Sequence, residues 1–300
     1  MSESYSICLY FCPLTIQECD RQISALLKSW LPEDELTKVD RYIKQEAKAQ
    51  GLMVRGYLRA LLSKHGSLLP NEWRFEYGEK GKPRLSYTQF KQTGIHFNLS
   101  HSGDWLLVGI CVPKAEKRNN LDAVEFGVDI ERCRSSTNIH AILSHYFSEP
   151  EKAALLALPA QLQRERFFDL WALKESYIKA KGLGLALSLK SFAFDFAPLS
   201  ESSLELDVTK SAGFGDASTG KGSTRHILLK QHIGLSIMQA SEAADTSTLE
   251  RQTMQPAKNW HCWLGHLDDN YRFAMSIGEC QQVSINAQQV DFKTLLQFEL

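Results

Sequence analysis

The chain has 300 residues, with 34 lysines and arginines against 35 aspartates and glutamates, a net charge of -1 and 43% hydrophobic residues. This is ordinary globular composition for one large domain or two modest ones, and it argues against a disordered chain, a polybasic membrane protein or a general nucleic-acid binder. No signal peptide or apolar run of roughly 20 residues is evident, and none of the seven cysteines forms a CxxC pair, so we expect a cytoplasmic protein with reduced thiols.

Hydrophobic periodicity predicts strands and helices in the first 112 residues. A helix is expected over residues 18–30 and a longer one over 34–64. The segment from Arg41 to Arg59 within the longer helix is rich in lysine and arginine, which indicates either an ordinary solvated face or a surface for an anion or an acidic partner. The expected strands are residues 5–11, 73–77, 95–99 and 105–112.

After a polar linker at 113–122, the pattern of strands and helices resumes. Two stretches rich in serine, glycine and threonine, 198–225 and 241–258, are expected to be flexible insertions. Apolar hairpins at 97–110 and 260–277 suggest a weak internal duplication. The expected strands are 124–130, 191–196, 227–238, 260–267 and 271–277, and the expected helices are 148–158 and 162–181.

Two carboxylates, Asp129 and Glu131, end an apolar strand in the segment GVDIE. Because side chains alternate along a strand, both carboxylates point to the same face. They repel each other unless a cation lies between them, and Mg²⁺ fits because it prefers oxygen ligands. The alternative is an ordinary exposed charged face.

The segment WALKESYIKAKG places Glu175 and Lys179 one turn apart on the second of these helices, with Gly182 near its end. A simple salt bridge between the two side chains is one interpretation. Three further lysines nearby favour an anion site instead: Lys174, Lys181 and Lys190.

The segment FNLSHSGDW carries Ser100 and His101 where a strand meets a turn, and Gly81-Lys82-Pro83 precedes it. A hydroxyl, an imidazole and turn amides can hold a phosphate. A serine hydrolase is disfavoured because the two adjacent side chains diverge and no GxSxG elbow is present. A zinc site in the segment HCWLGH, formed by His261, Cys262 and His266, lacks a fourth nearby ligand.

The order of these motifs is more specific than any one of them. GKP, FNLSHSGDW, GVDIE and FFDLWALKESYIKAKGLGL follow one another between residues 41 and 194. In this order they resemble the Sfp-type 4'-phosphopantetheinyl transferases. The resemblance implies a monomeric α+β fold of two similar α/β halves related by a pseudo-twofold axis, here residues 1–122 and 123–300, with coenzyme A between the halves.

The resemblance also implies an activity, in which the phosphopantetheine arm of coenzyme A passes to a serine of an apo acyl- or peptidyl-carrier domain. Carried over by motif position, Asp129, Glu131 and Glu175 would hold Mg²⁺. Lys179 would neutralise the leaving phosphate, and Glu175, directly or through a water on the metal, would be the base. The nucleotide end of coenzyme A would be held by Lys82, Ser100 and His101.

The implied carrier should be acidic, and the sequence offers two docking candidates. One is the basic segment 41–59; the other is the segment 132–146, where Ile139, Ile142 and Leu143 form either an apolar strip or part of the core. Two other functions stay open. They are a Mg²⁺-dependent pyrophosphate hydrolase that cleaves coenzyme A, and a non-enzymatic module that binds coenzyme A or the carrier.

Overall fold

The computed structural model describes residues 4–14, 21–114, 124–209, 222–240 and 252–296. The chain divides into two compact units. The unit called here the N-terminal unit comprises residues 3–121, 204–226 and 282–300. The unit called here the central unit consists mainly of residues 122–203 and 227–281. Each unit draws on segments that are far apart in the sequence, and the division into halves at residues 1–122 and 123–300 stays a prediction.

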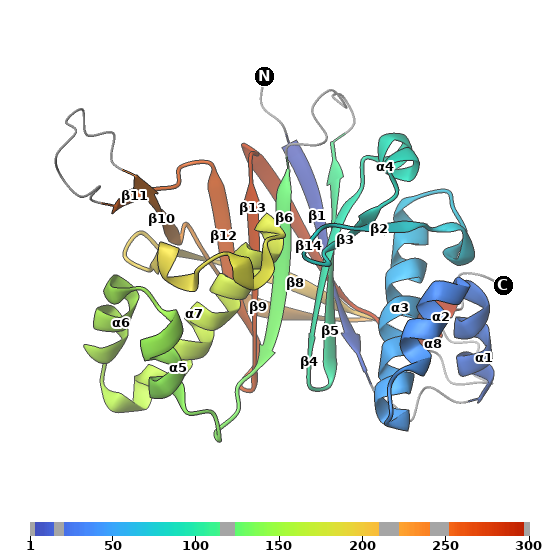
Figure 1. Cartoon of the computed structure of the whole chain (residues 1–300), viewed down its shortest axis with the longest axis horizontal. Coiled ribbons are helices and arrows are strands. Elements are labelled where there is room, and N and C mark those ends of the chain that lie inside the picture. Colours follow the sequence, from blue (N-terminus) through green and yellow to red (C-terminus); the bar gives the residue numbers. More distant parts are fainter. Residues whose placement is uncertain (1–3, 15–20, 115–123, 210–221, 241–251, 297–300) are drawn as a thin grey trace. The chain divides into compact units, whose positions relative to one another are not determined.

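The N-terminal unit contains strands in the order β4, β5, β1, β14, β8. Strand β1 pairs antiparallel with β5 and parallel with β14, so a strand from the end of the chain lies beside the first one. Figure 1 shows α3 with α1, α2 and α8 packed around it. The strands are β1 (Ser4–Pro13), β2 (Phe75–Tyr77), β3 (Pro83–Leu85), β4 (His96–Ser102), β5 (Trp105–Pro113), β8 (Ser200–Val208) and β14 (Gln282–Gln289), and the helices are α1 (Arg21–Trp30), α2 (Glu33–Asp40), α3 (Gln45–His65), η2 (Pro70–Glu72), α4 (Tyr87–Thr93) and α8 (Phe292–Leu296).

The long helix expected over residues 34–64 is wrong as a single element, because the chain turns between α2 and α3. In one straight helix, residues 24 positions apart would be separated by about 36 Å. Here Arg59 Nη2 donates to Glu35 Oε1 at 2.7 Å, and both side chains are buried. The break between the helices therefore allows a buried ion pair that local periodicity does not reveal.

The central unit is built on strands in the order β9, β12, β13, β6, with helix α7 packed against β6, β12 and β13. Figure 1 shows α5 and α6 beside α7. Strand β9 begins in the N-terminal unit and ends in the central one, whereas β8 begins in the central unit and ends in the N-terminal one. The strands are β6 (Glu125–Arg132), β7 (Phe192–Asp195), β9 (Ser223–Gln231), β10 (Gly234–Ala240), β11 (Gln252–Pro256), β12 (Trp260–Asp268) and β13 (Tyr271–Gly278), and the helices are α5 (Ile139–Tyr146), α6 (Glu149–Leu156), α7 (Ala160–Lys181), η4 (Gly184–Ala186) and η5 (Leu189–Ser191).

Helix α7 lies unusually close to strand β6 at Gly127. A Cβ atom at this position would stand 2.2 Å from the Ser176 carbonyl oxygen and 2.3 Å from the Ala180 amide nitrogen. Only a residue without a side chain allows this approach. The helix ends as expected at Gly182, whose φ of 67° places it in the left-handed conformation of a C-cap.

The mixed helix and sheet content confirms the α+β class. The insertions expected at 198–225 and 241–258 are wrong in part, because β8, the start of β9 and β11 lie within them. Residues 210–221, 241–251 and most of the expected linker, 115–122, lie outside the described residues. The strand expected over 227–238 is two strands, separated by a turn in which His232 has a φ of 57°.

Candidate active site

Strand β6 places Asp129 and Glu131 on the face that α7 covers. In the antiparallel ladder with β13, Asp129 lies opposite Ala274 and Glu131 lies opposite Arg272. Asp129 is 3% exposed and Glu131 is half-buried. The alternation expected from the sequence therefore brings both carboxylates to one face, one of them inside the protein.

Helix α7 supplies a lysine and a third carboxylate to this face. Lys179 Nζ donates to Asp129 Oδ1 at 2.6 Å, so the lysine reaches across to β6. Burial raises the pKa of Glu175; the charge of Asp129 raises it further and that of Lys179 lowers it. Glu175 therefore lies within electrostatic reach of both, and the sequence motifs that carry these residues meet in the folded unit.

Together, Asp129, Glu131, Glu175 and Lys179 carry three negative charges and one positive charge. Carboxylate oxygens are the ligands that hard divalent cations prefer, so the arrangement can attract such a cation. A half-buried carboxylate beside an ammonium group can also accept a proton. These four side chains constitute our candidate active site.

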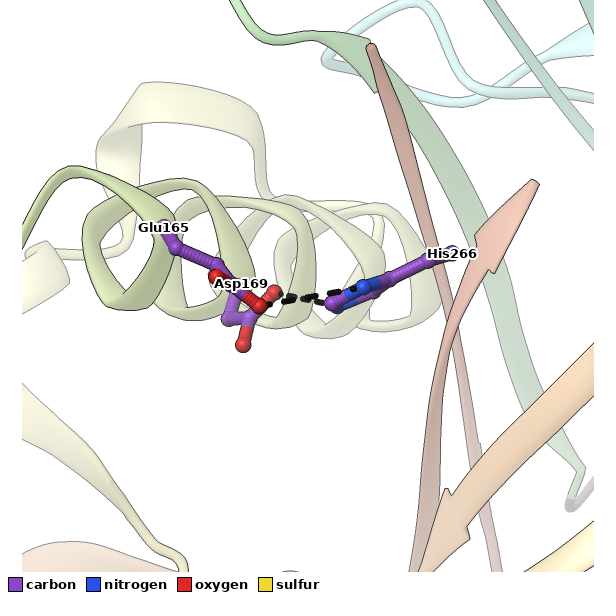
Figure 2. Close-up of side chains that lie close together, drawn as sticks. All are labelled: Glu165, Asp169 and His266. Carbon is purple, nitrogen blue, oxygen red and sulfur yellow. Dashed lines mark hydrogen bonds and ion pairs between the residues drawn. The ribbon is translucent and has the colours of Figure 1, made fainter. Parts of the chain in front are cut away.

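A second charged cluster lies further toward the N-terminal end of α7. This cluster consists of Glu165, Asp169 and His266. Among the described residues, it is the group of three possible metal-ligating side chains whose ligand atoms all lie within 4.8 Å of one another. Figure 2 shows Glu165 and Asp169 extending from the helix toward His266 on β12. The ligand atoms of Asp129, Glu131 and Glu175 are not all within 4.8 Å of one another in this structure.

Basic side chains already surround the buried carboxylate of this second cluster. His266 Nε2 lies 2.9 Å from Asp169 Oδ1, Arg272 Nε lies 3.3 Å from the same oxygen, and Lys230 Nζ lies 3.6 Å from Oδ2. A metal ion would have to displace these groups. We therefore consider the cluster a poor cation site, although its residues meet the distance criterion. No chemical role was expected for Glu165 or Asp169 from the sequence, although Asp169 lies within the segment FFDLWALKESYIKAKGLGL.

The zinc site considered in HCWLGH is not supported by these contacts. His261 Nε2 contacts the Cys280 carbonyl oxygen at 3.1 Å, and the buried Cys262 thiol accepts from Ser276. His266 contacts Asp169 instead. Alternation along the strand separates His261 from the other two side chains, and Cys262 and His266 contact different residues, Ser276 and Asp169.

The expectation that Lys174 belongs to an anion site is wrong. Its side chain is fully buried, forms an ion pair with Glu151 at 2.8 Å, and donates to the carbonyl oxygens of Leu189 and Phe192. Lys181 pairs with Glu125 at 2.7 Å. Lys174 therefore links α7 to α6, to η5 and to the start of β7, and Lys179 is the lysine that contacts Asp129.

The residues expected to hold the nucleotide end of coenzyme A lie in the N-terminal unit. Ser100 and His101 are in β4, where Ser100 is buried and His101 is exposed. Lys82 is half-buried, and its carbonyl oxygen accepts a hydrogen bond from the Gly78 amide, which closes a turn. It directly precedes β3, which contacts β4. Lys82, Ser100 and His101 thus come from neighbouring elements of one unit.

Both docking surfaces considered from the sequence are altered by the fold. Ile139 and Leu143 are buried in the core of the central unit, so the apolar strip is wrong. In the basic segment, Arg59 is fully buried and forms an ion pair with Glu35, and Arg55 Nε lies 3.9 Å from the same carboxylate. Part of the positive charge expected on that surface is therefore neutralised.

Comparison with known proteins gives two matches that together span most of the described chain. Residues 125–233 match the 4'-phosphopantetheinyl transferase superfamily, and residues 18–112 match the N-terminal part of 4'-phosphopantetheinyl transferases. The first match contains Asp129, Glu131, Glu175 and Lys179. The second contains Lys82, Ser100 and His101.

Individual relatives agree with these matches. The chain is 30% identical over 194 residues to the 4'-phosphopantetheinyl transferase Sfp of Bacillus subtilis, covering 65% of this chain and 77% of the relative. It is 31% identical over 181 residues to the transferase ffp of Bacillus subtilis, covering 60% and 71%. With HetI of Nostoc, the identity is 30% over 160 residues, covering 53% and 63%. Because the chain is 30% identical to Sfp over 77% of that relative, and both family matches agree, it belongs to the 4'-phosphopantetheinyl transferase family.

Proposed function

We propose that this protein transfers the 4'-phosphopantetheine arm of coenzyme A to a serine of an apo acyl- or peptidyl-carrier domain, releasing adenosine 3',5'-bisphosphate. The observation that carries the proposal is the contact of Lys179 with Asp129 at 2.6 Å, with Glu175 beside them. Lysine and carboxylates meet here in a partly buried site, which suits the transfer of a charged phosphoryl group.

Magnesium fits the donors of this site. Asp129, Glu131 and Glu175 offer only carboxylate oxygens, the ligand type that Mg²⁺ prefers, and Mg²⁺ is held in many phosphate sites by one or two carboxylates. When bound, Mg²⁺ would supply positive charge against the pyrophosphate of coenzyme A. The excess of negative charge among the four side chains supports a cation at this position.

The proposed step forms a bond between the carrier serine oxygen and the phosphorus of the pantetheine phosphate, and breaks the bond from that phosphorus to the bisphosphate. Glu175 accepts the serine proton, a role supported by its raised pKa. Lys179 donates to the oxygens that gain negative charge on the leaving phosphate. Lys179 would exchange its contact with Asp129 for these oxygens once substrate is bound.

We propose that Lys82, Ser100 and His101 bind the nucleotide end of coenzyme A. An ammonium group, a hydroxyl and an imidazole are suitable partners for phosphate oxygens. Their positions on neighbouring elements of one unit support a shared role. The proposal further assigns an acidic carrier domain as partner and a monomer in the cytoplasm as the working form. None of the described helices is both long and apolar enough to span a membrane.

Mass spectrometry of a panel of apo-carriers incubated with the protein, coenzyme A and Mg²⁺ tests the proposal. We expect one carrier to gain the mass of one phosphopantetheine arm, and the gain to disappear with EDTA or when the carrier serine is replaced by alanine. Cleavage of coenzyme A without a carrier would indicate the pyrophosphate hydrolase. Binding of coenzyme A or carrier without any mass gain across the panel would indicate a binding module, and either result contradicts the transferase.

A further inference from the structure

Arg272 occupies a position from which it could neutralise the candidate metal site. It lies directly opposite Glu131 in the ladder between β6 and β13. Residues directly opposite each other on antiparallel strands project from the same face, and oppositely charged pairs there attract. A cross-strand ion pair between Arg272 and Glu131 would therefore be the local expectation.

The contacts of Arg272 run elsewhere. Its Nε lies 3.3 Å from Asp169 Oδ1 and its Nη2 lies 4.0 Å from Glu165 Oε1. Its Nη1 donates to the carbonyl oxygens of Asp268 and Asp269 at 3.2 and 3.3 Å. The side chain is 7% exposed, so these contacts fix a buried guanidinium group away from its cross-strand neighbour.

The charges involved share one neighbourhood. The pKa of Cys133 is raised to about 11, chiefly by burial; the charge of Arg272 lowers it, and those of Asp169 and Glu131 raise it. Glu131, directly opposite Arg272 in the ladder, and Asp169, 3.3 Å from its Nε, are thus both neighbours of this arginine. Glu131 belongs to the proposed metal site, whereas Asp169 has no place in the proposed reaction.

Asp169 is well placed to hold the arginine. Its side chain is 2% exposed and is shared by His266 of β12, Arg272 of β13 and Lys230 of β9. Glu165, one turn earlier on α7, faces His266 (Figure 2), and its Oε1 lies 4.0 Å from Arg272 Nη2. A buried carboxylate fixed by three strands cannot easily follow Arg272 if the arginine turns toward Glu131.

We propose that Asp169 is a positioning residue that acts through Arg272: it holds the guanidinium group away from Glu131 and so preserves the negative charge of the metal site. The inference rests on the metal site of the proposed function. Without the Asp169 carboxylate, Arg272 turns to its cross-strand neighbour and competes with the metal ion. Residues outside the ligand set that orient or tune it commonly change metal affinity by about 10- to 100-fold.

Titration of the full chain with Mn²⁺ in the presence of coenzyme A, followed by electron paramagnetic resonance, measures this effect without requiring transfer. We expect Asp169→Asn to weaken Mn²⁺ binding by about tenfold. The double variant Asp169→Asn/Arg272→Gln should return to within about twofold of wild type, because the competing cation is gone. A carboxylate needed only for packing would give no such recovery.

Lys230→Met is the matched control, since it removes another cation from Asp169 and leaves the contact with Arg272 in place. Its Mn²⁺ affinity should stay within about twofold of wild type. Circular dichroism establishes that each variant is folded. If Asp169→Asn does not fold, Glu165→Gln replaces it. This half-exposed carboxylate is the second anion beside Arg272, and its loss should weaken binding by about fivefold, reversed by Arg272→Gln.

Wild-type affinity in a folded Asp169→Asn variant would overturn the role of Asp169 and leave the transferase proposal intact. A double variant that binds no better than Asp169→Asn alone would do the same. If the wild-type protein bound no Mn²⁺, the metal site itself would be refuted, and with it the role of Asp169.

Discussion

The two ends of helix α7 each place an aspartate in a buried, charged environment, but the charges around the two carboxylates differ. Near the C-terminal end, Asp129 meets Lys179, with Glu175 close by and Glu131 on the same strand face. Toward the N-terminal end, Asp169 is shared by His266, Arg272 and Lys230. The first carboxylate has one lysine and two further carboxylates near it, whereas the second contacts an arginine, a lysine and a histidine.

This difference shows why close ligand atoms alone do not define a metal site. The cluster around Asp169 is the tighter one, yet its negative charge is already balanced within the protein. The carboxylates around Asp129 lie further apart but carry an excess of negative charge. A divalent cation can balance that charge and can in turn bind a phosphate-bearing substrate. Under the proposed function, it is this charge balance that assigns the chemistry to the Asp129 end of α7.

Replacing Glu175 in the candidate active site should have the largest effect on transfer. Glu175→Gln keeps the shape of the side chain but cannot accept the serine proton, so we expect transfer to fall by about 10²- to 10⁴-fold. The rate is measured by mass spectrometry of the carrier under initial-rate conditions. Lys230→Met, at the other end of α7, is the control and should keep near wild-type turnover. Equal losses in both variants would mean that the two ends do not differ in function.

Lys179→Met separates charge stabilisation from metal binding at the same end. Loss of its positive charge should lower the transfer rate by about 10²- to 10³-fold. Mn²⁺ affinity should rise or stay unchanged, because Asp129 Oδ1 loses its ion pair with the lysine. Kinetics and Mn²⁺ titration of the same preparation check both parts. A variant with weaker Mn²⁺ binding would assign Lys179 to the support of the metal site instead.

Gly127→Ala tests the close approach that brings α7 to β6. The added Cβ would meet backbone atoms of Ser176 and Ala180 at 2.2 and 2.3 Å, so the helix must shift and we expect a loss of about 1–3 kcal/mol in unfolding free energy. Urea denaturation measures the loss. In the control Gly78→Ala, the nearest atom lies at 3.7 Å, and stability should be almost unchanged. Similar small losses in both variants would contradict the proposed role of Gly127.

The smallest expected effect concerns stability and pH. Because burial and Asp129 raise the pKa of Glu175 in the folded protein above the ordinary 4.5, its contribution to stability is present below pH 4.5 and is lost as the pH rises through the raised value. Glu175→Gln should therefore stabilise the folded protein at neutral pH by about 0.5–1 kcal/mol.

Denaturant unfolding at several pH values checks this expectation. The stability difference between Glu175→Gln and wild type should shrink as the pH falls toward 4.5. A variant that is less stable than wild type at neutral pH would show that the charged carboxylate contributes favourably to folding. If Glu175→Gln is more stable than wild type but loses transfer, Glu175 contributes to the reaction at a cost in folding stability.

Much of the local structure could be predicted from the sequence, because it depends on neighbours along the chain. Alternation placed Asp129 and Glu131 on one face of β6, helical spacing placed Glu175 and Lys179 one turn apart on α7, and Gly182 marked the end of that helix. Most strands were also expected near their observed positions. The exceptions, such as β8 and the break between α2 and α3, depend on partners far away in the chain.

The sequence by itself determined which side chains form the motifs, the α+β class and the family resemblance. Only the tertiary structure decided how those side chains are used. It sends Lys174 into a buried pair with Glu151, brings Lys179 to Asp129, and turns Arg272 from Glu131 toward Asp169. The physical reason is that electrostatic interactions depend on distance and burial, which sequence spacing does not specify once two elements pack against each other.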